Sequence, residues 1–126
     1  MNASSKKKLS QYERLAGTLR DRIAAGIYAR GDKLPSEMEL MDESGLSRST
    51  VRHALKVLVD EGLVRTERTA GRYVTEDRAL IEQLRAEAAR NLTAEFLEKM
   101  RGIGYGPEQA AALLERWNEK EGTNHD

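Results

Sequence analysis

The sequence contains no cysteine, only one phenylalanine and one tryptophan, and no long hydrophobic run. Without cysteine the chain has no disulfide, no thiolate nucleophile and no Cys-ligated zinc. Its apolar stretches are a few residues long, whereas a membrane-spanning helix needs about 20 apolar residues. The basic and polar start MNASSKKKLS has no apolar run behind it, so we expect no secretory signal and a cytoplasmic protein.

The chain also lacks a net charge, because its 126 residues include 21 basic and 21 acidic ones. The two parts of the chain differ, however. Residues 1–75 hold 14 basic and 10 acidic side chains, and residues 76–126 hold 7 and 11. A net charge of zero therefore does not argue against a nucleic-acid partner. The length of 126 residues predicts one domain, or one small domain with an appendage. The 39% of hydrophobic residues fall in periodic clusters, which argues against a wholly disordered chain.

Three serines mark expected helix starts in the first part of the chain. Ser10 is followed three residues later by Glu13, and Ser36 by Glu39, which is the capping-box pattern. Ser47 is expected to cap a third helix. Apolar residues recur behind each serine at three- and four-residue steps, which predicts an amphipathic helix in each case. The expected stops are Gly26, Gly45 and Gly62.

The helical spacing of the apolar residues ends after the third expected helix. Residues 63–67 and 72–75 are predicted to be short strands, joined by a hairpin tip in which Gly71 is free to adopt a positive φ. The second and third helices, with a tight turn between them, make a helix-turn-helix. The predicted fold is mainly α (α+β), with three helices and a hairpin wing.

The helix behind Ser47 carries the informative chemistry. Arg48 and Arg52 are four residues apart and share a face, where each guanidinium can bond guanine O6 and N7. Ser47, Ser49 and Thr50 place hydroxyls at the positive end of the helix dipole, which favours a phosphate. A solvated helix face would account for two arginines alone. The surrounding helix-turn-helix and hairpin favour DNA contact instead.

Further cationic residues extend the same surface. His53 and Lys56 flank the arginine face, and Arg65, Arg68 and Arg72 surround the hairpin tip. Such a wing can reach the minor groove, where cations meet an enhanced negative potential. For His53 we favour a surface position at the groove rim over a metal ligand, and we expect no metal and no cofactor.

These residues resemble the GntR family of bacterial transcription regulators. The matching residues are Tyr12, Gly31-Asp32-Lys33-Leu34-Pro35-Ser36-Glu37, Ser47-Arg48-Ser49-Thr50-Val51-Arg52, Glu61-Gly62-Leu63 and Gly71-Arg72-Tyr73-Val74. The resemblance covers residues 11–75 and implies a winged helix-turn-helix that binds operator DNA as a dimer. With the resemblance, the expected DNA-contacting residues are Ser36, Ser47, Arg48, Ser49, Thr50, Arg52, His53, Lys56, Arg68, Gly71 and Arg72.

Two positions depart from the family pattern. Met38 stands where some relatives carry an arginine that contacts DNA, and Thr69 stands where the wing usually has a first glycine. Residues 76–126 are too few for the larger effector domains of most members. Their two expected helices look like those of the YtrA-type subfamily, which serve for dimerisation.

The second part of the chain is predicted to hold two amphipathic helices, over residues 76–101 and from Pro107 onward. Their apolar stripe could cover the winged helix of the same chain. We favour a symmetric dimer, because one small module cannot hide two such faces. The expected dimerisation residues are Leu80, Ile81, Leu84, Ala88, Leu92, Phe96, Leu113, Leu114 and Trp117.

The leading hypothesis is a homodimeric, sequence-specific DNA-binding transcription regulator, in particular a repressor, on a palindromic operator. The alternatives are a small-molecule-responsive sensor with a pocket at the C-terminal helices or the dimer seam, and a winged-helix protein-interaction module. The chain has no catalytic constellation, so we do not expect an enzyme. The expected organisation is a basic arm over residues 1–9, a DNA-binding domain over 10–75, a dimerisation segment over 76–120 and a tail over 121–126. The arm, with Lys6, Lys7 and Lys8, either solubilises the chain or adds phosphate contacts.

Overall fold

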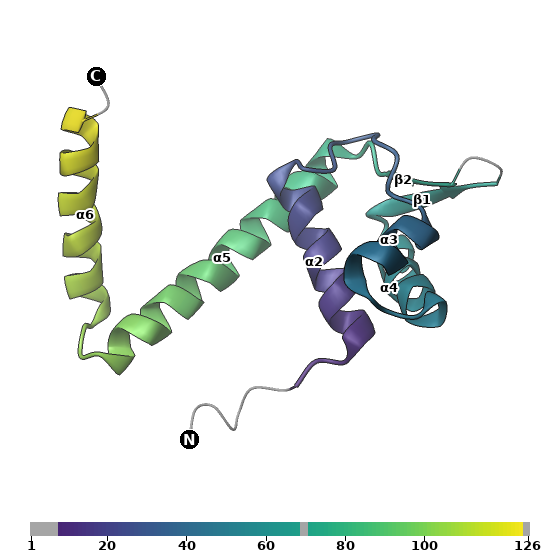
Figure 1. The fold of residues 1–126 in the computed structure, drawn as a ribbon. Coiled ribbons are helices and arrows are strands. Elements are labelled where there is room, and N and C mark those ends of the chain that lie inside the picture. Colours follow the sequence, from purple (N-terminus) through teal and green to yellow (C-terminus); the bar gives the residue numbers. More distant parts are fainter. Residues whose placement is uncertain (1–7, 69–70, 125–126) are drawn as a thin grey trace. The chain divides into compact units, whose positions relative to one another are not determined.

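The computed structural model describes residues 8–68 and 71–124 and contains the predicted helices and hairpin (Figure 1). The elements are α2 (Gln11–Ala25), α3 (Glu37–Ser44), α4 (Arg48–Asp60), β1 (Val64–Glu67), β2 (Gly71–Val74), α5 (Arg78–Gly102) and α6 (Pro107–Asn124). The mainly helical fold with a hairpin is therefore confirmed. None of the described helices combines the length and the apolar character that crossing a membrane requires.

Both predicted capping boxes are present. Ser10 Oγ accepts a hydrogen bond from Glu13 N at 3.3 Å, and Glu13 Oε1 accepts one from Ser10 N at 2.9 Å. Ser36 and Glu39 exchange the same pair of bonds at 3.1 and 2.8 Å. Each box satisfies two backbone N–H groups that have no partner inside the helix. The sequence therefore determines where these two helices begin.

Replacing Ser10 by alanine should lower the free energy of unfolding by about 1 kcal/mol, because the N–H of Glu13 loses its acceptor. Urea unfolding followed by far-UV circular dichroism measures the change. Thr18→Ala serves as the matched control, since Thr18 is an exposed residue inside the same helix. Equal unfolding curves for wild type and Ser10→Ala would contradict the capping role.

The hairpin is antiparallel, and Val64 pairs with Val74 and Glu67 with Gly71. Strand β1 begins one residue later than the predicted range 63–67 and ends where predicted, and β2 lies one residue before the predicted range 72–75. Residues 69 and 70 of the expected tip lie outside the described residues. Gly71 has φ +94°, as expected of it. A Cβ at this position would also lie 3.2 Å from Lys33 Cε, so glycine suits it on two counts.

The loop before α3 joins the hairpin, which the sequence did not predict. Lys33 forms an isolated antiparallel bridge with Tyr73, and Leu34 N donates to Arg72 O at 2.8 Å. The segment 31–35 is therefore partly extended rather than only a turn. A pairing this short leaves no alternation that a sequence pattern can reveal.

The core of the first unit comes from the predicted apolar faces of α2 and α4, together with the hairpin. Its largest fully buried side chains are Leu19, Ile23, Leu40, Val51, Leu55, Leu58 and Val74. This packing holds α4 with its apolar face inward. The opposite face, which carries Arg48 and Arg52, stays in solvent.

Helix α5 passes from one compact unit to the next. The chain divides into Met1–Ala86 and Glu87–Asp126, whereas the sequence suggested a domain boundary at residue 75. Ile81 is buried in the core of the first unit, and Leu80 and Leu84 pack against it. These three expected dimer residues thus take part in the first unit's own packing, because the helix continues directly from the winged fold.

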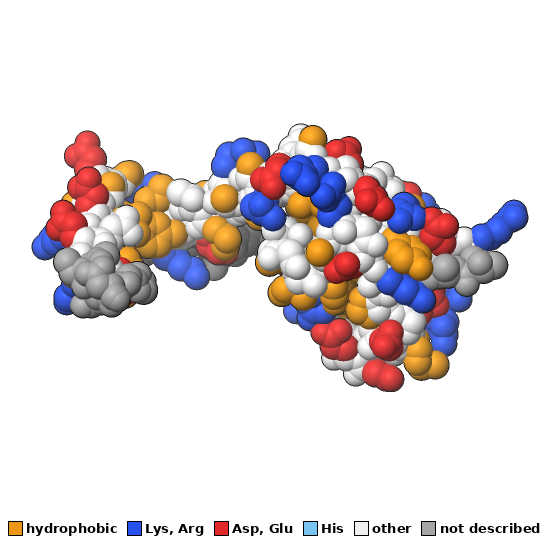
Figure 2. All heavy atoms as spheres, turned by 90° about the horizontal axis from the view of Figure 1, so that it is seen from above, with side chains coloured by type: hydrophobic (Ala, Val, Ile, Leu, Met, Phe, Trp, Pro, Cys, Tyr) orange, Lys and Arg blue, Asp and Glu red, His pale blue; other side chains and the backbone are white. Residues whose placement is uncertain are grey.

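The second unit contains the rest of α5 and helix α6, joined at glycines as predicted. Gly104 N donates to Arg101 O at 3.0 Å, and Pro107 is the first residue of α6. Ala110 is buried and Ala88 is half-buried. Large apolar side chains stay exposed on both helices: Leu92 at 65%, Phe96, Leu113, Leu114, and Trp117 at 62%. Figure 2 shows hydrophobic side chains lying open over this part of the chain.

Candidate nucleic-acid interface

The first turn of α4 gathers three hydroxyl groups. Ser47 caps the helix, and its Oγ accepts from Thr50 N at 3.2 Å and donates to Thr50 Oγ1 at 3.0 Å. Ser49 Oγ lies 3.3 Å from Ser47 Oγ. These groups surround the positive end of the helix dipole, beside N–H groups that a helix leaves unpaired. The arrangement can hold a phosphate.

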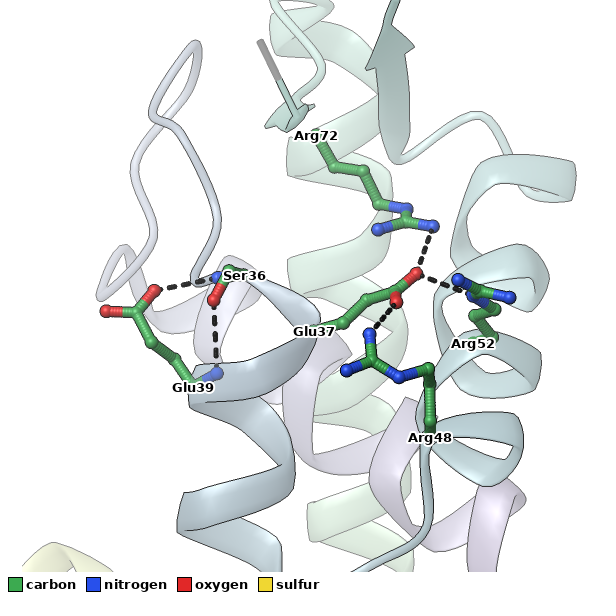
Figure 3. A network of polar contacts seen from close by, with 6 residues as sticks. All are labelled: Ser36, Glu37, Glu39, Arg48, Arg52 and Arg72. Atoms are coloured by element: carbon green, nitrogen blue, oxygen red, sulfur yellow. Dashed lines mark hydrogen bonds and ion pairs between the residues drawn. The ribbon is translucent and has the colours of Figure 1, made fainter. Parts of the chain in front are cut away.

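One carboxylate organises the arginines of this surface (Figure 3). Glu37, the first residue of α3, accepts from Arg48 Nη1 at 3.0 Å, from Arg52 Nε at 3.0 Å and from Arg72 Nη2 at 3.1 Å. The three guanidinium groups come from two elements, helix α4 and strand β2. Glu37 of α3 therefore links helix α4 to strand β2.

The carboxylate of Glu37 stays ionised at neutral pH. Its pKa lies below the usual range, chiefly because of the hydrogen bond from Arg52, with further lowering by Arg72 and Arg48 that outweighs partial burial. The Glu37 side chain is only 14% exposed, whereas Arg52 is 61% exposed. The anchor is thus sheltered while the arginines that it holds remain in solvent.

Arg52 is held in an orientation suited to base contact. Only its Nε bonds Glu37, and within the described residues Nη1 and Nη2 make no hydrogen bond. Those two nitrogens form the end of the guanidinium fork, which matches guanine O6 and N7. Arg48 uses Nη1 for Glu37 and is 46% exposed. Both predicted recognition arginines therefore share one anchor.

The two residues that flank the arginine face have partners within the protein. The ring of His53 stacks on Tyr12 of α2, with centroids 3.6 Å apart and planes at 11°. Lys56 Nζ lies 3.0 Å from Asp60 Oδ2 in an i,i+4 ion pair. The stack joins the exposed side of α4 to the first turn of α2. Lys56 is 71% exposed and can exchange Asp60 for a phosphate.

The wing residues have different surroundings. Arg68 is exposed beside the undescribed tip. Arg65 pairs with Glu67 and Glu76 and lies 5.0 Å from the ring of Tyr73. The charge of Arg65 is therefore paired with carboxylates on the hairpin and just after it.

Two further expected contacts concern the start of α3 and the arm. Ser36 is exposed, and its hydroxyl accepts from Glu39 N while it also bonds the Glu39 carboxylate. Met38, which stands where some relatives carry an arginine, is 53% exposed. Lys6 and Lys7 of the expected arm lie outside the described residues.

The sequence did not reveal the anchoring role of Glu37. Its partners are 11, 15 and 35 residues away, so no local spacing connects them. The available signal was an acidic residue at the start of the helix that precedes an arginine-bearing recognition helix. Because α3 packs on α4, Glu37 comes close enough to Arg48 and Arg52 to form ion pairs with them.

Comparison with known proteins identifies the fold. The family model described as "Bacterial regulatory proteins, gntR family" matches residues 11–74. The chain belongs to the GntR family. The Exu regulon transcriptional regulator of Escherichia coli K12 is 36% identical over 107 residues, which are 82% of this chain and 37% of that protein. The chain thus spans little more than a third of the length of this GntR-type relative.

Two solved structures resemble this GntR chain in different ways. A GntR family transcriptional regulator from Listeria monocytogenes is 30% identical with a TM-score of 0.75, over 88% of this chain and 97% of that one. The AraR DNA-binding domain in complex with operator ORX1 is 32% identical with a TM-score of 0.53, over 54% and 82%. Residues 11–74 therefore carry the GntR-family domain, with the fold that the AraR DNA-binding domain has in its operator complex. The closer assignment to the YtrA type stays a prediction.

Proposed function

We propose that this protein binds an inverted-repeat operator as a homodimer and represses transcription there. The observation that carries the proposal is the Glu37 anchor, which holds Arg48 and Arg52 together on the exposed face of α4. The crystallised complex of the similar AraR domain with operator DNA supports the same use of this fold. Repression requires only that the operator be occupied, and a dimer of this short chain is sufficient for that. Such a regulator acts in the cytoplasm, where bacterial DNA lies.

Dimerisation is inferred from the exposed apolar side chains of the second unit. Leu92 and Phe96 lie one turn apart on α5, and Leu114 and Trp117 lie about one turn apart on α6. Contiguous apolar surface of this kind marks an interaction site in a water-soluble protein. A second copy of the chain offers the same surface, and a two-fold dimer would present two α4 helices to half-sites about one helical turn apart.

Selection of bound duplexes from random DNA, at a stated salt concentration, tests the proposal directly. We expect a palindrome with fixed spacing between its half-sites. The half-site should contain a guanine at the position nearest Arg52. Absence of any enriched sequence would overturn specific DNA binding, and an enriched single half-site would overturn the symmetric dimer.

Replacing Arg52 by alanine should cost roughly 1–3 kcal/mol of discrimination at one base pair in each half-site, because its free guanidinium nitrogens no longer reach the base. Fluorescence anisotropy with the selected duplex and with single-base variants measures the loss. Lys56→Ala is the matched control, and it should weaken binding equally on all sequences and lower the salt slope by about one. Uniform weakening by Arg52→Ala would assign Arg52 to phosphate contact alone.

A further inference from the structure

A junction of only three residues, 75–77, joins the hairpin to helix α5, and it is bonded on both sides. Thr75 N donates to Leu63 O at 2.8 Å, and the Thr75 hydroxyl accepts from Asp77 N at 3.1 Å. The Asp77 carboxylate accepts from Leu80 N at 3.2 Å and so caps the start of α5. A connection this short, bonded at both ends, fixes where α5 begins.

The first turns of α5 pack on the core of the first unit. Ile81 is 7% exposed and belongs to that core, and Leu80 and Leu84 pack against it. Leu80 also approaches Gly62, where an added Cβ would lie 3.6 Å from Leu80 Cδ2. Apolar contacts are non-directional, so they favour packing without fixing the angle of the helix.

Arg85 adds a directional bond to this apolar packing. Its Nε donates to Ala24 O, in the last turn of α2, at 3.1 Å. The last carbonyls of a helix have no partner within it, and they attract cations. Nη1 of the same guanidinium donates to Glu82 Oε2 at 2.9 Å, which orients the side chain. Figure 1 shows α5 beginning beside the end of α2, where this bond forms. The junction and the Arg85 bond therefore hold the beginning of α5 at two separate points.

Helix α5 is continuous from Arg78 to Gly102 and carries exposed apolar residues of the proposed dimer, such as Leu92. The direction in which α5 leaves the first unit therefore affects where the two α4 helices of a dimer can lie. We propose that Arg85 is a positioning residue that fixes this direction and thereby selects the spacing between operator half-sites. This inference rests on the homodimer of the proposed function.

Arg85 lies away from the surface that reads DNA. It bonds the last turn of α2, whereas Tyr12 in the first turn of α2 stacks on His53 of α4. A helix of 15 residues is about 22 Å long. Loss of the Arg85 side chain should therefore leave binding to a single half-site as it is and change only the response to spacing.

The test compares the affinity of the full chain for three kinds of duplex: the selected operator, operators with one base pair added or removed between the half-sites, and an isolated half-site. One base pair moves a half-site by about 3.4 Å and turns it by about a tenth of a helical turn. We expect the wild type to bind the altered operators at least about tenfold more weakly, as if one base pair were mismatched. In Arg85→Ala this ratio should fall at least about fivefold, because one charged hydrogen bond no longer opposes tilting of α5.

Two further variants and one direct measurement accompany this comparison. Arg85→Lys keeps a cationic donor for Ala24 O and should recover part of the ratio. Arg78→Ala is the matched control, because it removes the same charge from an exposed residue in the first turn of α5, and it should keep the wild-type ratio. Amide hydrogen exchange in residues 78–86 should be faster in Arg85→Ala than in either of these two variants.

Three results would overturn the proposal. The first is a wild-type ratio in Arg85→Ala. The second is an equal fall of the ratio in Arg78→Ala, which would indicate an effect of charge rather than of the Arg85 bond. The third is an equal loss of affinity for the half-site and for every full operator in Arg85→Ala. Failure of the proposed function gives a different result, since the wild-type chain would then enrich no palindrome at all, and both proposals would fall.

Discussion

Replacing Glu37 by glutamine should reduce the preference for operator over random DNA by roughly 2–4 kcal/mol, about thirtyfold to a thousandfold. The carboxylate bonds both Arg48 and Arg52, and a well-placed bidentate arginine contributes about 1–3 kcal/mol of base discrimination. Glutamine keeps the shape but removes the charge. Glutamine has one acceptor oxygen where the carboxylate has two, so Arg48 and Arg52 can no longer both be held in the orientation that presents their remaining nitrogens. Binding to random DNA should rise slightly, because one negative charge is removed from the surface.

Anisotropy titrations with operator and with random duplex measure this preference. Glu39→Gln is the matched control, because it makes the same change of charge two residues away. Glu39 bonds the backbone and side chain of Ser36, which lowers the pKa of Glu39, and takes no part in the arginine cluster. A glutamine can still accept the bond from Ser36 N, so the capping box survives. If both variants keep the wild-type preference, Glu37 does not position the arginines.

The same substitution should alter the response to acid. The pKa of Glu37 is lowered in the folded chain, from the ordinary value of 4.5, so its ion pairs stabilise the fold at neutral pH. That stabilisation is lost as the pH falls below 4.5 through the folded-state pKa. The wild type should therefore lose more stability on acidification than Glu37→Gln, which has no proton to gain there. Parallel unfolding curves at neutral and acidic pH give this difference.

The sequence predicted those parts of the fold that depend on neighbouring residues. The capping boxes of Ser10 and Ser36 are local, since each involves residues three positions apart. The apolar faces of α2 and α4 follow the helical period, and both are buried as expected. The bridge between Lys33 and Tyr73 involves residues 40 positions apart, which a local pattern cannot indicate.

The sequence predicted which residues make up the candidate site, but not which contacts they form with one another. Arg48, Arg52 and the hydroxyls of α4 could be identified from their spacing on one helix. Their attachment to Glu37, and the stacking of His53 on Tyr12, arise only when separate helices pack. The beginning of α5 is a similar case. Ile81 continues the apolar stripe of α5, which was expected to form the dimer, yet it packs into the core of the first unit. Periodicity identifies an apolar face but does not say which surface covers it.

Replacing Phe96 by aspartate should abolish the proposed dimer and weaken binding to the full operator by roughly a hundredfold or more. The proposed dimer binds its second half-site at the high effective concentration that the first contact creates, and a monomer loses this gain. Binding to an isolated half-site should not change, because Phe96 lies in the second unit and the Glu37 cluster lies in the first. Sedimentation velocity and anisotropy on full and half operators measure the two effects.

Two further variants separate dimerisation from a general disturbance of α5. Ala94→Asp introduces the same charge two residues before Phe96, on the far side of the helix, and should remain dimeric. Trp117→Asp alters an exposed residue of α6 and should behave like Phe96→Asp. A buried charge in an apolar interface is expensive, so a real interface cannot tolerate either substitution. If both remain dimeric with full operator affinity, the apolar surface of the second unit has another partner, and the symmetric dimer must form elsewhere or not at all.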